Sequence, residues 1–172
     1  MDKGPKGRFE KVEVEGVGAL WIARARGEIC GAAFGKGKRE FLLKLPGGVL
    51  WTQRPGKALR KSGGVRKHGR RVVRLRALCG MKHRLYGGTP FQRRVWKAIA
   101  SIPWGEVRSY AWVARKAGRP RAVRAAAAAC GANPVPVVVP CHRVVASDGA
   151  IGGFSGGLAI KKKLLKLEGH RF

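Results

Sequence analysis

The hydrophobic pattern in the first half of the chain predicts short β-strands. Up to about Tyr86, short apolar runs alternate with glycines and basic residues. Runs of about four to eight residues between turn residues are typical of strands. The predicted strands are 11–14, 19–23, 29–34 and 72–78. Residues 41–45 fit either a strand or a helix, and turns are expected at 47–48 and 62–64.

The second half has the spacing of amphipathic helices. Four apolar residues fall on one helical face of residues 91–99, namely Phe91, Val95, Trp96 and Ile99. Before them, Thr89 is placed to cap this helix and Pro90 to occupy its first position. The glycines at 87 and 88 indicate a linker, and a last helix is expected to end near Leu167.

Two further helices, 109–117 and 121–130, are predicted on either side of a turn at 118–120. Helices joined by a tight turn that contains glycine are typical of a helix-turn-helix. Arg121 and Arg124 lie one turn apart on the second helix, and alanines fill residues 125–129. Small side chains allow close approach to DNA or tight packing inside the protein, and the sequence leaves both possibilities open.

Together these elements predict an α+β fold. We expect a supporting N-terminal domain at residues 1–87, built around a small antiparallel sheet, and a mainly helical domain at 88–172 that carries the helix-turn-helix. At 172 residues the chain is long enough for one large domain or two small ones. Its 45% of hydrophobic residues is typical of a globular protein.

The charge of the chain narrows its partners. Its 37 Lys and Arg residues against 9 Asp and Glu residues give a net charge of +28. So basic a surface attracts polyanions, and nucleic acid is the first candidate because basic side chains displace counterions from phosphates. Adaptation to high salt or temperature, or general solubility, is the alternative explanation.

Nothing in the sequence predicts a membrane segment or a secretion signal. The apolar stretches 125–129 and 135–139 are far shorter than the roughly 20 residues that a spanning helix needs. Residues 1–8 are polar and lack the apolar core of a signal peptide. We therefore expect a cytoplasmic protein without a membrane partner.

Four cysteines are spread along the chain without a CxxC pair: Cys30, Cys79, Cys130 and Cys141. Structural zinc sites use closely paired ligands, so none is predicted. Cys79 and His83 could form half of an irregular metal site, although a buried structural thiol is the commoner state. The nucleotide-binding motif GxxxxGK[ST] is also missing from the sequence, and we expect neither a metal nor a cofactor.

Residues 133–145 carry the candidate chemistry. Prolines at 134, 136 and 140 exclude regular helix, so we expect an extended, rigid segment. The segment presents Cys141 beside His142 and Arg143, and an imidazole or a cation favours the reactive thiolate. For an isolated Cys-His pair, a structural cysteine beside a surface histidine is the alternative.

Longer motifs surround this cysteine. They are Phe-Gln-x-x-Val-Trp at 91–96, Gly-Glu-Val-x-Ser-Tyr at 105–110, Pro-Cys-His-Arg-Val at 140–144 and Gly-Gly-Phe-Ser-Gly-Gly-Leu-Ala at 152–159. With this combination over residues 91–169, the chain resembles the O6-alkylguanine-DNA alkyltransferase family. The resemblance implies direct DNA repair, in which an alkyl group passes irreversibly from O6 of guanine to the protein's own cysteine.

The resemblance also implies catalytic roles. Cys141 would be the nucleophile, His142 would activate it through a water, and Glu168 would orient His142. Asn133 would hold the cysteine segment against the second helix, and Tyr110 would donate a proton to the departing guanine. From the residues alone, Glu168 could instead pair with nearby lysines, Asn133 could form a turn, and Tyr110 could pack in the core.

A DNA-binding surface is implied as well. In the family, the second helix enters the minor groove, and an arginine at the position of Arg124 fills the space of the nucleotide that is flipped out. Arg119 and Ser147 match positions that touch the DNA backbone. We expect Arg121 and Arg143 to bind DNA too.

The base pocket is expected to contain Tyr110, Pro136, Val144, Gly152, Phe154 and Ser155. The glycine-rich segment 152–157 resembles a lid over this pocket, not a phosphate cradle. Phe154 stands where the family commonly has tyrosine, so the stacking face is kept and one hydroxyl is lost.

The expected partner is double-stranded DNA that contains O6-alkylguanine, bound by a monomer, with cooperative binding left open. Two other classes of protein compete with this interpretation. A non-catalytic helix-turn-helix lesion sensor or regulator would share the DNA surface, but known sensors of this kind replace the cysteine. A cysteine hydrolase or redox enzyme using Cys141 and His142 would not explain Arg124 or the net charge of +28.

Overall fold

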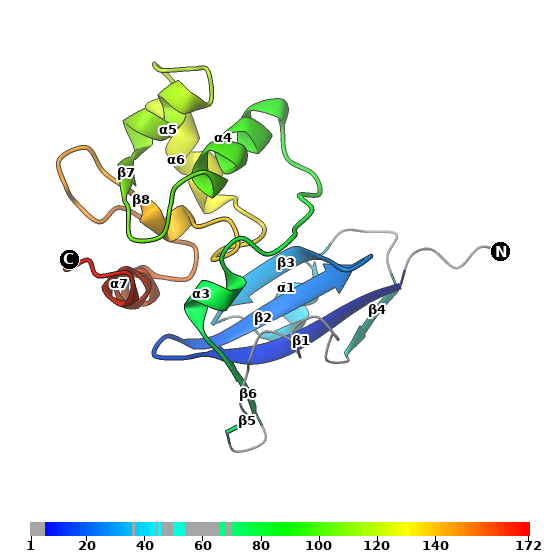
Figure 1. Cartoon of the computed structure of the whole chain (residues 1–172). Helices are drawn as coiled ribbons and strands as arrows, with labels where there is room; N and C mark the ends of the chain where they lie inside the picture. The colour runs from blue at the N-terminus through cyan, green and yellow to red at the C-terminus, as the bar shows by residue number, and fades with distance from the viewer. Residues whose placement is uncertain (1–5, 36, 44, 46–49, 54–65, 68–69) are drawn as a thin grey trace.

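The N-terminal half begins with a meander of three antiparallel strands. The structure, a computed structural model, describes residues 6–35, 37–43, 45, 50–53, 66–67 and 70–172. The meander consists of β1 (Lys6–Val14), β2 (Gly18–Ala25) and β3 (Glu28–Phe34), as Figure 1 shows. Three predicted strands are thus confirmed and are longer than expected. The predicted turns at 47–48 and 62–64 lie outside the described residues.

Further strands make the sheet mixed. β4 (Leu50–Gln53) and β6 (Arg70–Val73) both run parallel to β1, one beside residues 6–9 and the other beside residues 13–14. β5 (Arg66–Lys67) pairs with β6. The α+β class is confirmed, and the expected antiparallel sheet is present as the β1–β3 meander, but the complete sheet is mixed. Parallel pairing between strands so distant in sequence leaves no local pattern to detect.

The predicted strand at 72–78 is wrong in its second part. β6 ends at Val73, and α3 (Leu75–Leu78) follows. Leu75 and Leu78 are both buried, and a spacing of three places them on one face of a helix but on opposite faces of a strand. In the ambiguous segment, residues 41–43 are helical and belong to α1 (Lys38–Leu43).

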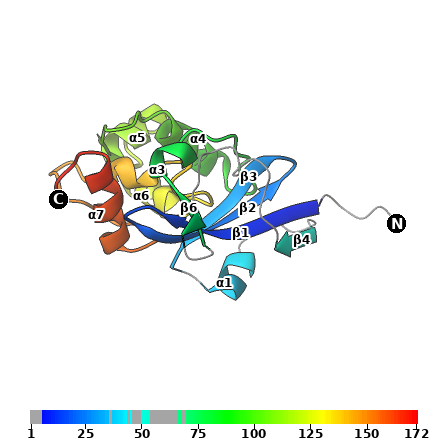
Figure 2. The ribbon, with the colours of Figure 1, turned by 60° about the horizontal axis from the view of Figure 1, so that its bottom comes forward.

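Alternating side chains cover both faces of the meander. Phe9 and Trp21 lie on the face where Phe41 of α1 packs, and the Trp21 and Phe41 rings stack with centroids 5.9 Å apart. Val12 and Leu20 belong to the main core on the other face, which continues into the second half of the chain. Figure 2 shows α1 on the opposite side of the sheet from the later helices. The domain division at residues 87 and 88 stays a prediction.

The first helix of the second half, α4 (Pro90–Ala100), has the predicted cap. Thr89 Oγ1 accepts from Gln92 N at 3.2 Å, and Gln92 Oε1 accepts from Thr89 N at 2.8 Å. This reciprocal capping box satisfies two donors that the helix itself leaves unpaired. Trp96 is buried, and its Nε1 donates to Ala129 O at 2.8 Å, which ties α4 to α6 (Val123–Gly131).

The predicted helix-turn-helix consists of α5 (Tyr110–Lys116) and α6, which pack against each other. Gly118 turns the chain between them at φ 77°, a conformation that glycine adopts without strain. Ala126 and Ala129 are buried, whereas Ala125 and Ala128 are exposed on the face of Arg124. The two faces of the alanine helix therefore match the two possibilities that the sequence left open.

The segment before Cys141 forms a tight turn, not the extended stretch that we expected. Val139 N donates to Val135 O at 3.0 Å, and Val137 has φ 76°, which strains a β-branched residue. Prolines exclude helix but are compatible with turns, which explains the wrong prediction. The elements that follow are η1 (Cys141–Arg143), β8 (Val144–Val145), which pairs with β7 (Arg108–Ser109), and α7 (Leu158–Leu167).

The described helices are short. α4 has 11 residues and α7 has 10. Across the part of the chain that the structure describes, no helix combines the length and the apolar character needed to cross a membrane.

Candidate active site and nucleic-acid interface

Cys141 is held in place by Asn133, two residues after the end of α6. Asn133 Nδ2 donates to Cys141 Sγ at 3.1 Å and to Val139 O at 2.8 Å. On its other side, Asn133 Oδ1 accepts from Val135 N at 3.1 Å. One carboxamide therefore ties the nucleophile to both ends of the preceding turn, so Asn133 combines the anchoring role with the turn role that was its alternative.

Cys141 is a neutral thiol in the resting site. It is 4% exposed, and burial raises its pKa to about 11, although the hydrogen bond from Asn133 and the charge of Lys161 favour the thiolate. The thiolate is the reactive form of cysteine. Reaction at Cys141 therefore needs a group that takes the proton as the attack proceeds.

His142 has the geometry of such a base. Its Nε2 lies 2.8 Å from Glu168 Oε1, and both side chains are 0% exposed. Burial lowers the pKa of His142, so the imidazole is neutral. Because an ionised carboxylate only accepts, Nε2 carries the ring proton and Nδ1 is the acceptor. Nδ1 is buried without a hydrogen-bond partner among the described residues, so it can take a proton.

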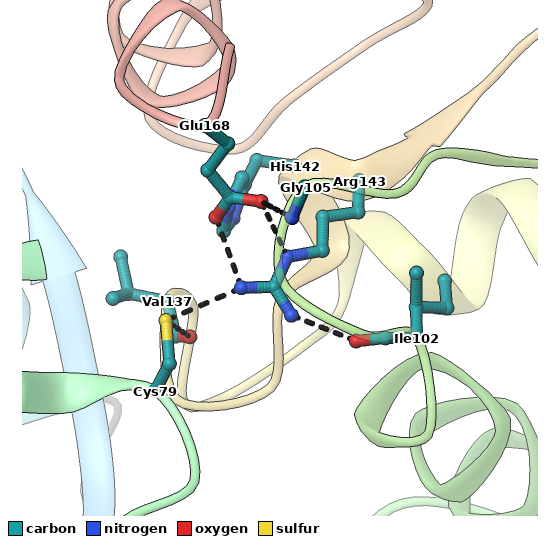
Figure 3. Close-up of polar contacts among 7 residues, drawn as sticks. All are labelled: Cys79, Ile102, Gly105, Val137, His142, Arg143 and Glu168. Carbon is teal, nitrogen blue, oxygen red and sulfur yellow. Dashed lines mark hydrogen bonds and ion pairs between the residues drawn. The ribbon is translucent and has the colours of Figure 1, made fainter. Parts of the chain in front are cut away.

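Glu168 is kept as an anion by its neighbours. It accepts from Arg143 Nε at 2.8 Å, from Arg143 Nη2 at 2.9 Å and from Gly105 N at 3.2 Å (Figure 3). Burial raises the pKa of Glu168, but the hydrogen bonds from His142 and Arg143 outweigh burial and hold it at about 2. A fixed charge of this kind both orients the imidazole and stabilises it when it takes a proton.

Arg143 belongs to this buried network, which corrects the prediction that it binds DNA. Its side chain is 4% exposed. Nη1 donates to Ile102 O at 2.7 Å, and the guanidinium lies 5.6 Å from the centroid of the Trp104 ring. A guanidinium enclosed in this way cannot reach a phosphate. The prediction was wrong because an arginine in a chain of net charge +28 looks like a surface residue.

Lys161 is a functional candidate that the sequence analysis missed. It is fully buried, and its Nζ donates to Val144 O at 2.6 Å and to Gly153 O at 3.1 Å. Burial lowers its pKa to about 8. Lys161 thereby joins β8 to the glycine-rich segment 152–157. Helical spacing could have found it, because residues 161, 164, 165 and 168 are buried on one face at the end of the chain.

A cavity of about 400 Å³ lies beside Cys141. Its lining residues are Tyr110, Ala127, Cys130, Gly131, Cys141, Gly153, Phe154 and Ser155. Of the residues expected to form a base pocket, Tyr110, Phe154 and Ser155 line this cavity. Pro136 instead lines a neighbouring cavity of about 220 Å³, to which Ser155 also contributes.

Tyr110 forms part of the cavity wall next to the glycine-rich segment. Its Oη donates to Gly153 O at 3.5 Å, and burial raises its pKa, so the hydroxyl keeps its proton. Gly152 packs on this ring at φ 67°, where an added Cβ would lie 2.8 Å from Tyr110 Oη, so only glycine fits. Val144 was also expected in the pocket, but it lines neither of these two cavities. Its carbonyl accepts from Lys161 Nζ.

The three exposed arginines expected to meet DNA lie in α6 or in the turn before it. Arg119, Arg121 and Arg124 are exposed, and Arg119 lies over the Phe91 ring of α4 with its guanidinium 5.9 Å from the centroid. Ser147 is exposed in the turn that follows β8. α6 also supplies Ala127, Cys130 and Gly131 to the cavity wall. A single helix therefore connects the basic surface to the cavity.

The suggested half of a metal site is not formed. Cys79 Sγ accepts from Arg143 Nη2 at 3.4 Å, whereas His83 Nδ1 contacts Met81 O at 3.1 Å. Within the described ranges, no three His, Cys, Asp or Glu side chains gather as a metal-binding group.

Sequence comparison places the second half of the chain among known proteins. Residues 90–170 match the family model described as "6-O-methylguanine DNA methyltransferase, DNA binding domain". A methylated-DNA--protein-cysteine methyltransferase of Salmonella typhimurium is 52% identical over 84 residues, which are 49% of this chain and 49% of that protein. In these matches the chain spans about half the length of the curated relatives.

Solved structures from Mycobacterium tuberculosis extend the similarity to nearly the whole chain. An OGT in complex with DNA has a TM-score of 0.70 and 30% identity, and the match covers 94% of this chain and 93% of that one. The chain belongs to the O6-methylguanine DNA methyltransferase family. An O6-methylguanine methyltransferase of the same organism has a TM-score of 0.73 and 29% identity, with 96% and 94% of the chains covered. Membership of this family confirms the resemblance found in residues 91–169 and extends it through the N-terminal sheet.

Proposed function

We propose that this protein repairs O6-alkylguanine in double-stranded DNA by moving the alkyl group onto Cys141. The proposal is carried by the position of Cys141, which lines a cavity of about 400 Å³ together with residues of α6, the helix that bears the exposed Arg124. Ligand pockets commonly have volumes of about 300 to 1,000 Å³, so a single base can be accommodated. The names of the relatives, methylated-DNA--protein-cysteine methyltransferase and OGT in complex with DNA, support the same activity.

The lesion has to leave the base stack before Cys141 can reach it. In the proposed complex α6 enters the minor groove, where the exposed Ala125 and Ala128 allow a close approach. Arg124 fills the space of the nucleotide that rotates into the cavity. The other predicted DNA-binding residues that are exposed, Arg119, Arg121 and Ser147, hold the phosphates and fix the register.

The transfer is a displacement at the alkyl carbon. His142 Nδ1 takes the proton of Cys141 through one water, and Sγ attacks the carbon attached to O6. The S–C bond forms as the C–O6 bond breaks, and the electron pair stays on O6. Tyr110 Oη gives its proton to the departing guanine and recovers one from solvent. The products are guanine and S-alkylcysteine, and the thiol proton leaves through His142.

Each molecule acts once in this scheme. A thioether has no hydrolysable bond and a poor leaving group, so Cys141 is not regenerated.

Lys161 assists by its charge, which favours the thiolate form of Cys141. The cytoplasmic location and the monomeric state stay predictions.

The test follows the lesion in the DNA. A duplex containing one O6-methylguanine is incubated with excess protein, and the nucleosides are quantified by liquid chromatography. We expect the wild-type protein and a Cys30→Ala control to convert the lesion to guanine. Cys141→Ala should bind the duplex with similar affinity and leave the lesion in place. A wild-type protein that binds the duplex without converting the lesion would contradict the proposal and favour a lesion sensor.

A further inference from the structure

One side chain of the N-terminal half reaches the catalytic network. Cys79, which follows α3, accepts from Arg143 Nη2 at 3.4 Å and lies 3.8 Å from Val137 O, to which its thiol donates (Figure 3). The other partners of Arg143 and Glu168 in the described chain, Ile102, Gly105 and His142, all belong to the second half.

These two contacts require the neutral thiol. The S–H group donates to the carbonyl of Val137 while a sulfur lone pair accepts from Arg143. Burial raises the pKa of Cys79 to about 11, and the nearby charge of Arg143, which favours the thiolate, does not overcome it. Cys79 therefore presents a donor and an acceptor together at neutral pH.

The two partners of Cys79 lead to the two reacting groups. Val137 belongs to the strained turn whose Val139 carbonyl is bound by Asn133, the residue that holds Cys141. Arg143 binds both oxygens of Glu168, which orients His142. One thiol thus contacts the turn of the nucleophile on one side and the anchor of the base on the other.

We propose that Cys79 is a positioning residue through which the N-terminal half keeps His142 and Cys141 in register for transfer. This inference rests on the proposed function. Without the sulfur acceptor, Arg143 loses one partner of Nη2 and no longer holds Glu168 in a single orientation. Glu168 is then neutralised less by Arg143, and the protonated form of His142 becomes easier to populate.

The experiment compares three variants. Cys79→Val removes the donor and the acceptor at similar size, and Cys79→Ser keeps both. Cys30→Val is the matched control, because Cys30 is a buried thiol of β3 in the same half of the chain and donates to Ala23 O at 3.6 Å, outside the network. Two quantities are measured as functions of pH: the single-turnover rate of methyl transfer from an O6-methylguanine duplex, and the protonation of His142 by imidazole NMR in the free protein.

We expect Cys79→Val to transfer about 2- to 10-fold more slowly at neutral pH, the range that one lost hydrogen bond gives. Its rate profile and the His142 NMR titration should both move to higher pH. Cys79→Ser should stay within about twofold of wild type, and Cys30→Val should keep the wild-type rate at a comparable loss of thermal stability.

Two results would overturn the inference. One is a Cys79→Val protein with the rate and the His142 titration of wild type. The other is an equal loss of rate in Cys79→Val and Cys30→Val, which would show a general effect of stability. If Cys79→Val does not fold, Cys79→Ala takes its place. A wild-type protein without transfer would contradict the proposed function instead, and the NMR titration would still test the link from Cys79 to His142.

Discussion

The two halves of the chain bury different kinds of side chain. The first half buries apolar residues on both faces of a sheet and, among its described polar residues, only Arg24. The second half buries five polar or charged side chains: Asn133, His142, Arg143, Lys161 and Glu168. Burying such groups is costly unless they are paired. The first half is therefore stabilised mainly by apolar packing, whereas the buried polar groups of the second half depend on one another for pairing.

Removing the buried charge of Glu168 should have the largest effect on the second half. Glu168→Gln leaves Arg143 buried without its carboxylate, and loss of one partner of a buried pair costs about 3 to 5 kcal/mol. We expect the free energy of unfolding in urea to fall by this order, and the transfer rate to fall about 100-fold because His142 loses its anchor.

The control for this variant is Glu106→Gln. Glu106 pairs with Arg108 at the surface, where its side chain is 42% exposed, so its loss should cost about 0 to 1 kcal/mol. Equal destabilisation by the two substitutions would contradict the role assigned to Glu168.

Arg124 offers the next largest effect, on the outer face of the same half. Arg124→Ala should slow transfer from duplex DNA by about 10- to 100-fold, because the flipped-out state loses the side chain that fills its space. Nonspecific affinity for DNA should change much less. Arg115→Ala, an exposed arginine of α5, is the control in the same gel-shift and single-turnover assays. A loss of binding that matches the loss of transfer would show that Arg124 acts only as a phosphate contact.

Acid should weaken the second half in particular, because Glu168 is buried there as an anion. The pKa of Glu168 is held at about 2, below its ordinary value of 4.5, so the folded state binds fewer protons in this range than the unfolded state. The contribution of Glu168 is therefore present above about pH 4.5 and is lost as the pH falls toward 2. Thermal unfolding of wild type and Glu168→Gln should converge in this window. Parallel curves down to pH 2 would contradict the pairing.

The smallest expected effect on stability comes from Lys161 and appears at alkaline pH. Its pKa is lowered from 10.5 to about 8, so the unfolded state binds more protons between these values and wild-type stability rises with pH there. Lys161→Met has no such group. The melting temperature of wild type should therefore rise relative to that of Lys161→Met between about pH 8 and pH 10. A difference that does not change with pH would contradict the lowered pKa of Lys161.

The same contrast explains which features the sequence predicted. The strands at 19–23 and 29–34 and the cap at Thr89 rest on local patterns, and the structure confirms them. The parallel pairing of β4 and β6 with β1 depends on contacts between distant segments, which no local pattern shows. The run at 72–78 was apolar enough for a strand, and only the packing of Leu75 and Leu78 decides for a helix.

The candidate site divides in the same way. Cys141 and His142 stand in a motif and were found from it. The burial of Arg143 could not be foreseen, since it depends on Glu168, which follows 25 residues later in the chain. The contact from Cys79 to Arg143 is harder still to predict from the sequence, because it joins residues 64 positions apart and α3 itself was predicted as a strand.

The mass of the protein after repair tests alkyl transfer to Cys141 most directly. Wild-type protein is incubated with excess O6-methylguanine duplex, and its intact mass and peptide map are recorded. We expect a gain of one methyl group per molecule, located on Cys141, that does not increase with more substrate or longer time. An unchanged mass with DNA bound, or a methyl group on Cys30, Cys79 or Cys130 instead, would contradict it.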